Sequence, residues 1–249
     1  MTDATNSLFE KSIGLALVGL ILMPFTPGMA KEPPPAAAVL EAVRTNQVNQ
    51  MVQLQGKLST YQGRKRAIHP FGLSMKGPEM RFAFANPAQT ITRLVKGNRC
   101  VISEGFNGAQ EKAVSSKDYG LRIRGTDLNF EDLSLRFLYW NQAEMLGEDV
   151  VNEKICWKIR LTNPGAGPYG SVLVWIDQVY YTLWQVEGSD RNGRTIKRFQ
   201  VARGQRVTMK WNGRKEKRWI LREMSIQSFH PNTGRMTGRT KLLLDKPIQ

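Results

Sequence analysis

From Lys57 to its end, the chain is built of short runs rich in β-branched and aromatic residues, separated by turn residues at roughly regular spacing. This pattern is typical of antiparallel all-β proteins and predicts about ten strands. In residues 155–161 the odd positions are apolar and two of the three even positions are basic, which predicts a half-buried strand. Asn192-Gly193 and Asn212-Gly213 predict two-residue hairpin turns of type I′, so we expect a meander.

One helix is predicted before the strands, from Ala36 to about Gln55. Its apolar face comprises Val39, Leu40, Val43, Met51 and Leu54. No alternation of strands and helices follows, so the predicted fold class is mainly β (α+β), a curved antiparallel sheet that holds a helix. Residues 171–176 and 179–186 are apolar on both faces. We therefore expect a helix or an apolar ligand to cover the sheet there.

The N-terminal segment has the features of a secretory signal. Residues 13–25 form an uncharged apolar run, and small residues follow up to Ala30. A helix of this length spans about 20 Å, whereas a hydrocarbon core is about 30 Å thick, so a permanent anchor is the weaker interpretation. We predict a signal peptide at residues 1–30, cleaved near Ala30, and one soluble periplasmic domain at residues 31–249.

The chain has two cysteines, Cys100 and Cys156. An oxidising periplasm permits one disulfide between them, and two buried free thiols are the equal alternative. Two cysteines do not make a metal site, and no cofactor is predicted.

The net charge of +15 at pH 7 indicates an anionic partner. For an exported protein, this means lipid headgroups or acidic glycans rather than nucleic acid. The basic hairpin at residues 210–219 is either a solvated tip or a patch that attracts headgroups.

Candidate catalytic groups are few. His69 and His230 each precede a proline in a loop-like context, which favours structural turns over catalysis. The acidic cluster Asp127, Glu131 and Asp132 is interpreted as capping a short helix, because acids favour the first helical turn. We therefore expect a protein that is not an enzyme and has no catalytic residue.

Four motifs carry a resemblance to a known family. Residues 125–133 read Gly-Thr-Asp-Leu-Asn-Phe-Glu-Asp-Leu, and Leu-Gly-Glu begins at residue 146, before a strand. Val-Trp-Ile-Asp follows at 174–177 and Asp-Arg-Asn-Gly-Arg at 190–194, before Lys197. In order and spacing, across about residues 120–200, these motifs resemble the outer-membrane lipoprotein-sorting proteins of the LolA-like family.

The resemblance implies a curved, half-open antiparallel β-barrel wrapped around one or more helices. Its concave apolar face would shelter lipoprotein acyl chains, or other lipids, during transfer toward the outer membrane. Partners would be an inner-membrane release complex and an outer-membrane acceptor. The family signature comprises Gly125, Thr126, Asp127, Glu131 and Asp132, as a structural element, a lid or a partner contact. Candidates for the acyl cavity are Phe82, Phe84, Trp157, Val174, Leu183, Trp184, Met209 and Trp219.

Two rival functions remain open. One is an exported basic protein that binds anionic glycans or lipid headgroups without an acyl cavity. The other is an enzyme in which Asp127 and Glu131 form an acid pair, which predicts a hydrolytic activity lost on mutating both.

Overall fold

The structure of the chain is a computed structural model that describes residues 32–48, 50–62, 65–211 and 214–245. From Pro33 onward, the described residues form one compact unit. The predicted signal peptide and its cleavage site lie outside the described residues.

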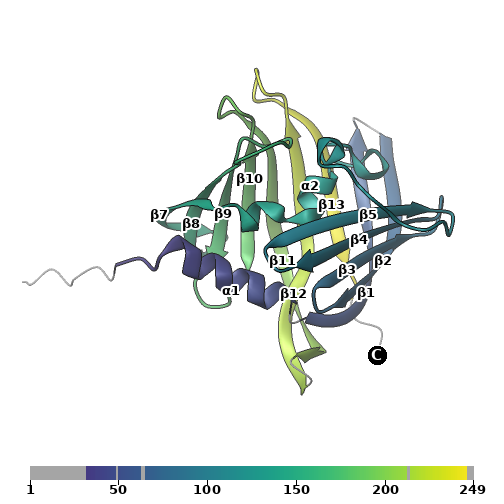
Figure 1. Cartoon of the computed structure of the whole chain (residues 1–249), viewed down its shortest axis with the longest axis horizontal. Coiled ribbons are helices and arrows are strands. Elements are labelled where there is room, and N and C mark those ends of the chain that lie inside the picture. The colour runs from purple at the N-terminus through teal and green to yellow at the C-terminus, as the bar shows by residue number, and fades with distance from the viewer. Residues whose placement is uncertain (1–31, 49, 63–64, 212–213, 246–249) are drawn as a thin grey trace, which may run out of the picture. The chain divides into compact units, whose positions relative to one another are not determined.

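The described residues fold into one antiparallel sheet of thirteen strands with a few short helices (Figure 1). The first half comprises α1 (Ala36–Val48), β1 (Gln50–Gln62), β2 (Lys65–Lys76), β3 (Glu79–Phe84), β4 (Gln89–Lys96), β5 (Arg99–Phe106) and β6 (Lys112–Ala113). The link after it carries η1 (Ser116–Asp118), η2 (Ile123–Gly125), α2 (Phe130–Ser134) and η3 (Arg136–Tyr139). The second half comprises β7 (Gln142–Val151), β8 (Lys154–Thr162), β9 (Ser171–Asp177), β10 (Leu183–Ser189), β11 (Thr195–Trp211), β12 (Arg214–Phe229) and β13 (Met236–Leu244).

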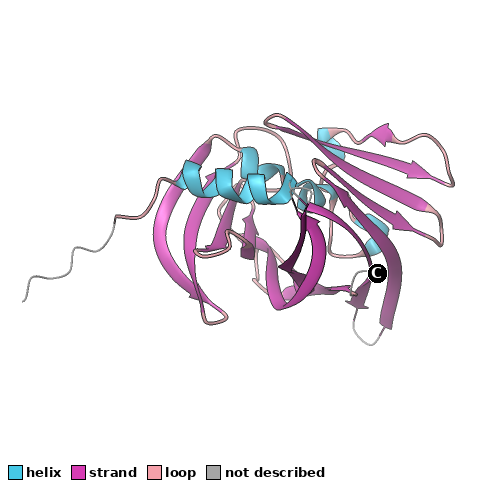
Figure 2. Cartoon of the chain, turned by 90° about the horizontal axis from the view of Figure 1, so that it is seen from below, coloured by secondary structure: helices cyan, strands magenta, loops and turns pink. Residues whose placement is uncertain are grey.

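The two edge strands of the sheet follow each other directly in the sequence. The order runs from β6 through β1 to β13 and on to β7, so β6 and β7 are the edge strands. The link from residue 114 to residue 141 therefore passes from one edge of the sheet to the other. It carries the short helices with it, and the two views agree that the sheet curves and stays open (Figures 1 and 2).

Helices and strands share one large apolar core on the concave face. Helix α1 contributes Ala36, Val39, Leu40 and Val43, and it crosses in front of β8, β9 and β10 (Figure 1). The link between β6 and β7 contributes further buried apolar side chains, including Phe130 and Leu138. The predicted fold class, mainly β with a curved half-open sheet around helices, is confirmed.

The structure corrects the predicted helix end. The helix ends at Val48, and residues 50–62 form β1. Val52 and Leu54 are buried, whereas Met51 and Gln53 are exposed, which is the two-residue alternation of a strand. The prediction that Met51 and Leu54 share a helical face is therefore wrong.

Other local predictions also need correction. Thirteen strands form where about ten were predicted. The hairpin at Asn192-Gly193 is present, but only Gly193 has a positive φ, so the turn is not of type I′. The carboxylate of Asp190 accepts the Asn192 and Arg194 N–H groups in that turn instead. His69 lies in β2 rather than in a loop. Residues 212–213 of the second predicted turn lie outside the described residues.

Candidate functional site

Five of the eight candidate lining residues lie on the concave face. Phe82 and Phe84 of β3 and Val174 of β9 are buried in the large core. Trp157 of β8 and Leu183 of β10 are partly buried and pack against it. The sequence thus brings these five side chains to one apolar face, although they come from both halves of the sheet.

The remaining three candidates are not part of that cluster. Trp184 packs on the opposite face, beside Trp175. Trp219 is 55% exposed, and strand alternation places it on the face opposite Val207 and Ile220, which belong to the core. The side chain of Met209 lies outside the described part of the structure.

The outer face of β7–β10 carries a small aromatic cluster of its own. Trp175 donates its indole N–H to Asp149 over 2.9 Å, and the Lys158 ammonium lies 4.9 Å from the Trp175 ring centroid and 3.1 Å from Asp149. These two donors lower the pKa of Asp149 to about 2. Trp184 and the fully buried Cys156 pack on the same cluster. One face of β9 therefore packs on the large core and its other face packs on this aromatic cluster, which explains why both faces are apolar.

The signature segment is fixed to the sheet at Asp132. Asn129 and Asp132 form a capping box at the start of α2, with backbone-to-side-chain hydrogen bonds of 2.8 and 2.9 Å. The same carboxylate accepts the Lys197 ammonium of β11 over 2.8 Å and the Tyr169 hydroxyl over 2.5 Å. Burial and the Asp132 carboxylate raise the pKa of Tyr169 well above its usual value. The predicted capping role is confirmed for Asp132, where it comes with a buried ion pair, but the carboxylates of Asp127 and Glu131 have other partners.

Asp127 joins the segment to the last two strands. It accepts the hydroxyl groups of Ser228 and Thr240 over 2.8 Å each, and its own N–H donates to the Thr240 hydroxyl over 2.9 Å. A Cβ at Gly238 would lie 2.2 Å from the Asp127 carboxylate, so only glycine permits this approach. Gly238 and Thr240 of β13 therefore both serve this contact.

Glu131 is fully buried and faces Arg136. The Nε of Arg136 donates to both carboxylate oxygens over 2.8 and 2.7 Å, and its Nη2 donates to the Ala166 carbonyl. Burial raises the pKa of Glu131, and the Arg136 guanidinium opposes this rise. Both Glu131 and Asp127 are thus buried and hydrogen-bonded, which is the state of structural carboxylates.

The sequence analysis missed Arg93, a buried arginine on the concave face of β4. Its Nε donates to the Ser134 carbonyl at the end of α2 over 2.9 Å, and its Nη2 donates to the Gln47 side chain of α1 over 2.9 Å. Arg93 therefore joins both helices to the sheet. Alternation with the buried Ile91 two residues before it was the signal that could have placed Arg93 on the apolar face.

Two other polar contacts hold the C-terminal half of α1. Arg44 donates to the Leu138 carbonyl over 3.3 Å, and the Asn46 amide donates to the Tyr180 carbonyl over 3.0 Å. In both hydrogen bonds the acceptor is a neutral backbone carbonyl, and the bond is partly buried or exposed. These contacts are weaker than the buried ion pair of α2.

The two cysteines are free thiols and lie in different surroundings. Cys100 donates its thiol to the Ser134 carbonyl beside α2, whereas Cys156 lies in the outer aromatic cluster. Burial raises the pKa of both thiols, for Cys156 to about 11. In this structure the alternative of two thiols holds.

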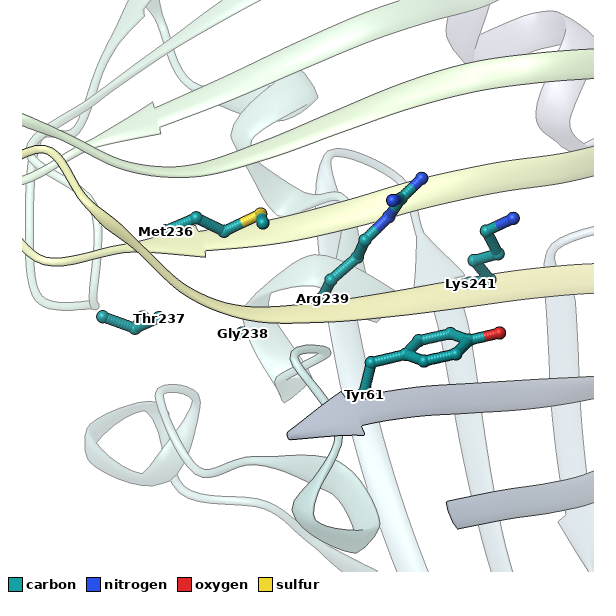
Figure 3. Close-up of a pocket in the computed structure, with 6 residues that line it drawn as sticks. All are labelled: Tyr61, Met236, Thr237, Gly238, Arg239 and Lys241. Carbon is teal, nitrogen blue, oxygen red and sulfur yellow. The ribbon is translucent and has the colours of Figure 1, made fainter. Parts of the chain in front are cut away.

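Two surface pockets are lined by residues other than the eight candidates. The larger has a volume of about 460 Å³ and is lined by residues of β1 and β13 (Figure 3). The smaller has a volume of about 320 Å³ and lies beside the loop at Asp190. Among the described residues, no group of histidine, cysteine or acidic side chains is arranged to hold a metal ion. No helix in the described ranges has both the length and the apolar character needed to cross a bilayer.

Comparison with known proteins supports the fold. A family model described as an uncharacterized protein matches residues 109–238, which is 130 of the 249 residues. No curated protein matches the sequence. Three solved structures are similar over 86% of this chain and 92–93% of their own: a DUF1329 family protein from Desulfovibrio piger (17% identity, TM-score 0.65), a domain from Vibrio parahaemolyticus named for outer membrane lipoprotein sorting (15%, 0.65) and a LolA superfamily protein from Nitrosomonas europaea (13%, 0.60).

Proposed function

The chain belongs to the family whose model matches residues 109–238, its fold is that of the LolA-like proteins, and from this premise we propose that it is a carrier for acyl chains. Lipids or lipoprotein acyl chains would bind the concave apolar face while they pass through water toward the outer membrane. The carrier needs no catalytic residue, because apolar transfer supplies about 0.8 kcal/mol for each methylene that it buries.

The observation that carries this proposal is the continuous apolar face under α1. Phe82 and Phe84 from one half of the sheet and Val174 from the other belong to the same cluster as the α1 side chains. Non-directional contacts of this kind accept chains of different lengths. In the proposed loaded state, acyl chains take the place of α1 on this face.

We further propose that residues 1–30 are a signal peptide, that the carrier domain begins at residue 31, and that the protein acts in the periplasm. An inner-membrane release complex would load it and an outer-membrane acceptor would unload it. These steps rest on the sequence pattern, and the similarity to a domain named for outer membrane lipoprotein sorting supports them.

The first test uses two tryptophans whose side chains lie on opposite faces of the sheet. Trp157 packs on the concave core and Trp184 on the outer cluster, and both are partly buried. The mature chain is purified from envelopes, its organic extract is analysed by mass spectrometry, and uptake of a triacylated lipopeptide is measured. We expect Trp157→Glu to lose saturable uptake and Trp184→Glu to retain it.

The outcome that contradicts the carrier is equal uptake by both variants, or no acylated species and no uptake by the parent. Circular dichroism melts identify variants that fail to fold. Phe82→Leu and Leu183→Gln serve as milder changes on the concave face if Trp157→Glu unfolds.

A second test asks whether α1 must move. The Asn46 amide contacts the backbone carbonyl of Tyr180, so Asn46→Cys with Tyr180→Cys is the pair chosen to link α1 to the β9–β10 turn, in a chain with Cys100→Ser and Cys156→Ala. A mass two hydrogens lower in the oxidised protein verifies that the disulfide has formed. We expect the oxidised protein to lose uptake and the reduced protein to regain it. Full uptake in the oxidised form would contradict displacement of α1.

The alternative function is binding of anionic glycans or lipid headgroups without an acyl cavity. The net charge of +15 favours it. Retained, salt-sensitive glycan binding together with no lipopeptide uptake would select this alternative.

A further inference from the structure

The larger pocket lies on the outer face of the sheet, away from the apolar core. It is lined by Tyr61 of β1 and by Met236, Thr237, Gly238, Arg239 and Lys241 of β13. In Figure 3 the side chains of Tyr61, Arg239 and Lys241 extend along one side of these two neighbouring strands. Thr240, between the two cations, points inward to Asp127, which confirms that Arg239 and Lys241 face outward.

The pairing register brings a third cation to this pocket. Tyr61 lies opposite Arg239 on β13 and opposite Arg66 on β2, so the three side chains form one row across the sheet. The Arg66 guanidinium lies 5.6 Å from the centroid of the Tyr61 ring. The tyrosine ring therefore separates two guanidinium groups on an exposed face.

The cations of the pocket are poorly neutralised. Lys241 has one acidic neighbour, Glu223, at 3.5 Å. Arg239 and Arg66 form no ion pair with any carboxylate of the described residues. The lining of the pocket thus carries positive charge that carboxylates of the described residues neutralise only at Lys241.

We propose that this pocket binds a phosphate ester, with Arg239 and Lys241 on the phosphate oxygens and the Tyr61 hydroxyl as a further donor. Guanidinium groups bind phosphate in a bidentate manner, and the ammonium adds a point charge. A volume of about 460 Å³ exceeds what a phosphate ion fills, so the pocket also takes the organic part of the ester. The ligand is either a phospholipid headgroup or a soluble sugar or glycerol phosphate. This inference does not depend on the acyl-carrier function.

The test compares two double variants of the mature chain that remove the same charge. Arg239→Gln with Lys241→Gln changes the pocket, whereas Arg99→Gln with Lys96→Gln changes two exposed cations on the β4–β5 hairpin. Calorimetry measures binding of glycerol 3-phosphate and of inorganic phosphate. Cosedimentation measures binding to vesicles of phosphatidylglycerol and, for comparison, of phosphatidylcholine.

We expect the pocket variant to weaken binding at least about tenfold, and the hairpin variant to weaken it less than about twofold at 0.15 M salt. Tyr61→Phe, which removes only a hydroxyl, should have an intermediate effect. Vesicle binding that glycerol 3-phosphate displaces identifies a headgroup site, and binding of the soluble ester alone identifies a soluble ligand. Equal weakening by both double variants, or no binding by the parent chain, overturns the proposal. Lipopeptide uptake should be unchanged in the pocket variant.

Discussion

Replacing Lys197 by methionine tests whether the signature segment is a fixed part of the fold. Lys197 and Asp132 lie 2.8 Å apart, and their side chains are 9% and 1% exposed. Removing the ammonium leaves a buried carboxylate without its counter-ion, which costs about 3–5 kcal/mol. The capping contact from Asn129 and the hydroxyl of Tyr169 remain but supply no charge. The loss is a large part of the stability of a typical domain.

The neighbouring residue offers a matched control. Arg198 also forms an ion pair, with Glu187 at 2.7 Å, but its side chain is 39% exposed on the other face of β11. Arg198→Met should therefore cost about 0–1 kcal/mol. For a chain of this size the midpoint should fall by about 6–20 °C for Lys197→Met and by less than about 4 °C for Arg198→Met. Urea unfolding followed by circular dichroism gives the free energies directly.

A double-mutant cycle completes the test. Adding Asp132→Asn to Lys197→Met removes the stranded charge and should recover part of the loss. If Lys197→Met costs no more than Arg198→Met, the ion pair is not buried in solution. The segment would then be free to act as a lid.

Three further outcomes are expected. Gly188→Ala should cost about 1–3 kcal/mol in urea unfolding, because its Cβ would lie 2.4 Å from a buried tyrosine ring, whereas Gly72→Ala, with open space around it, should be neutral or slightly stabilising. Cys100 and Cys156 should resist iodoacetamide at pH 8 until the protein unfolds, since burial raises both thiol pKa values; a native mass two hydrogens lower would mean a disulfide. Asp149→Asn should destabilise by less than about 1 kcal/mol at pH 7, and the difference should shrink from pH 4 to pH 2, because the folded pKa of about 2 lies below the ordinary 3.8.

Local patterns predicted much of the sheet. Alternation placed Ile159 and Leu161 on the buried face of β8, as the structure has them. The same pattern in Val52 and Leu54 was hidden because Met51 and Leu54 also fit the spacing of the apolar face of the preceding helix. A period of 3.6 and a period of 2 fit such a short stretch equally well, and so the helix end was misplaced.

Long-range contacts could not be predicted in the same way. The carboxylate of Asp127 bonds to Ser228 and Thr240, which lie more than 100 residues later. Capping explained the acids of α2 locally, but it gave no sign of Lys197. Likewise, the face of a tryptophan depends on the register, and the bulge in β10 between residues 183 and 185 sends Trp184 outward.

Helices α1 and α2 both cover the concave face, but different contacts hold them in place. These contacts decide which of the two helices an acyl chain can displace. Helix α1 buries Val39, Leu40 and Val43, worth about 5–9 kcal/mol by transfer. The hydrogen bonds of its Arg44, Asn46 and Gln47, the last of them donated by Arg93, all have a neutral acceptor, so none of the three is an ion pair. About ten buried methylenes of one acyl chain contribute about 8 kcal/mol, which matches α1. Helix α2 adds buried ion pairs at Asp132 and Glu131, whose rupture an acyl chain cannot compensate because it supplies no charge. Loading should therefore move α1 and leave α2 in place, so that hydrogen exchange on lipopeptide binding rises in residues 36–48 and stays unchanged in residues 130–134.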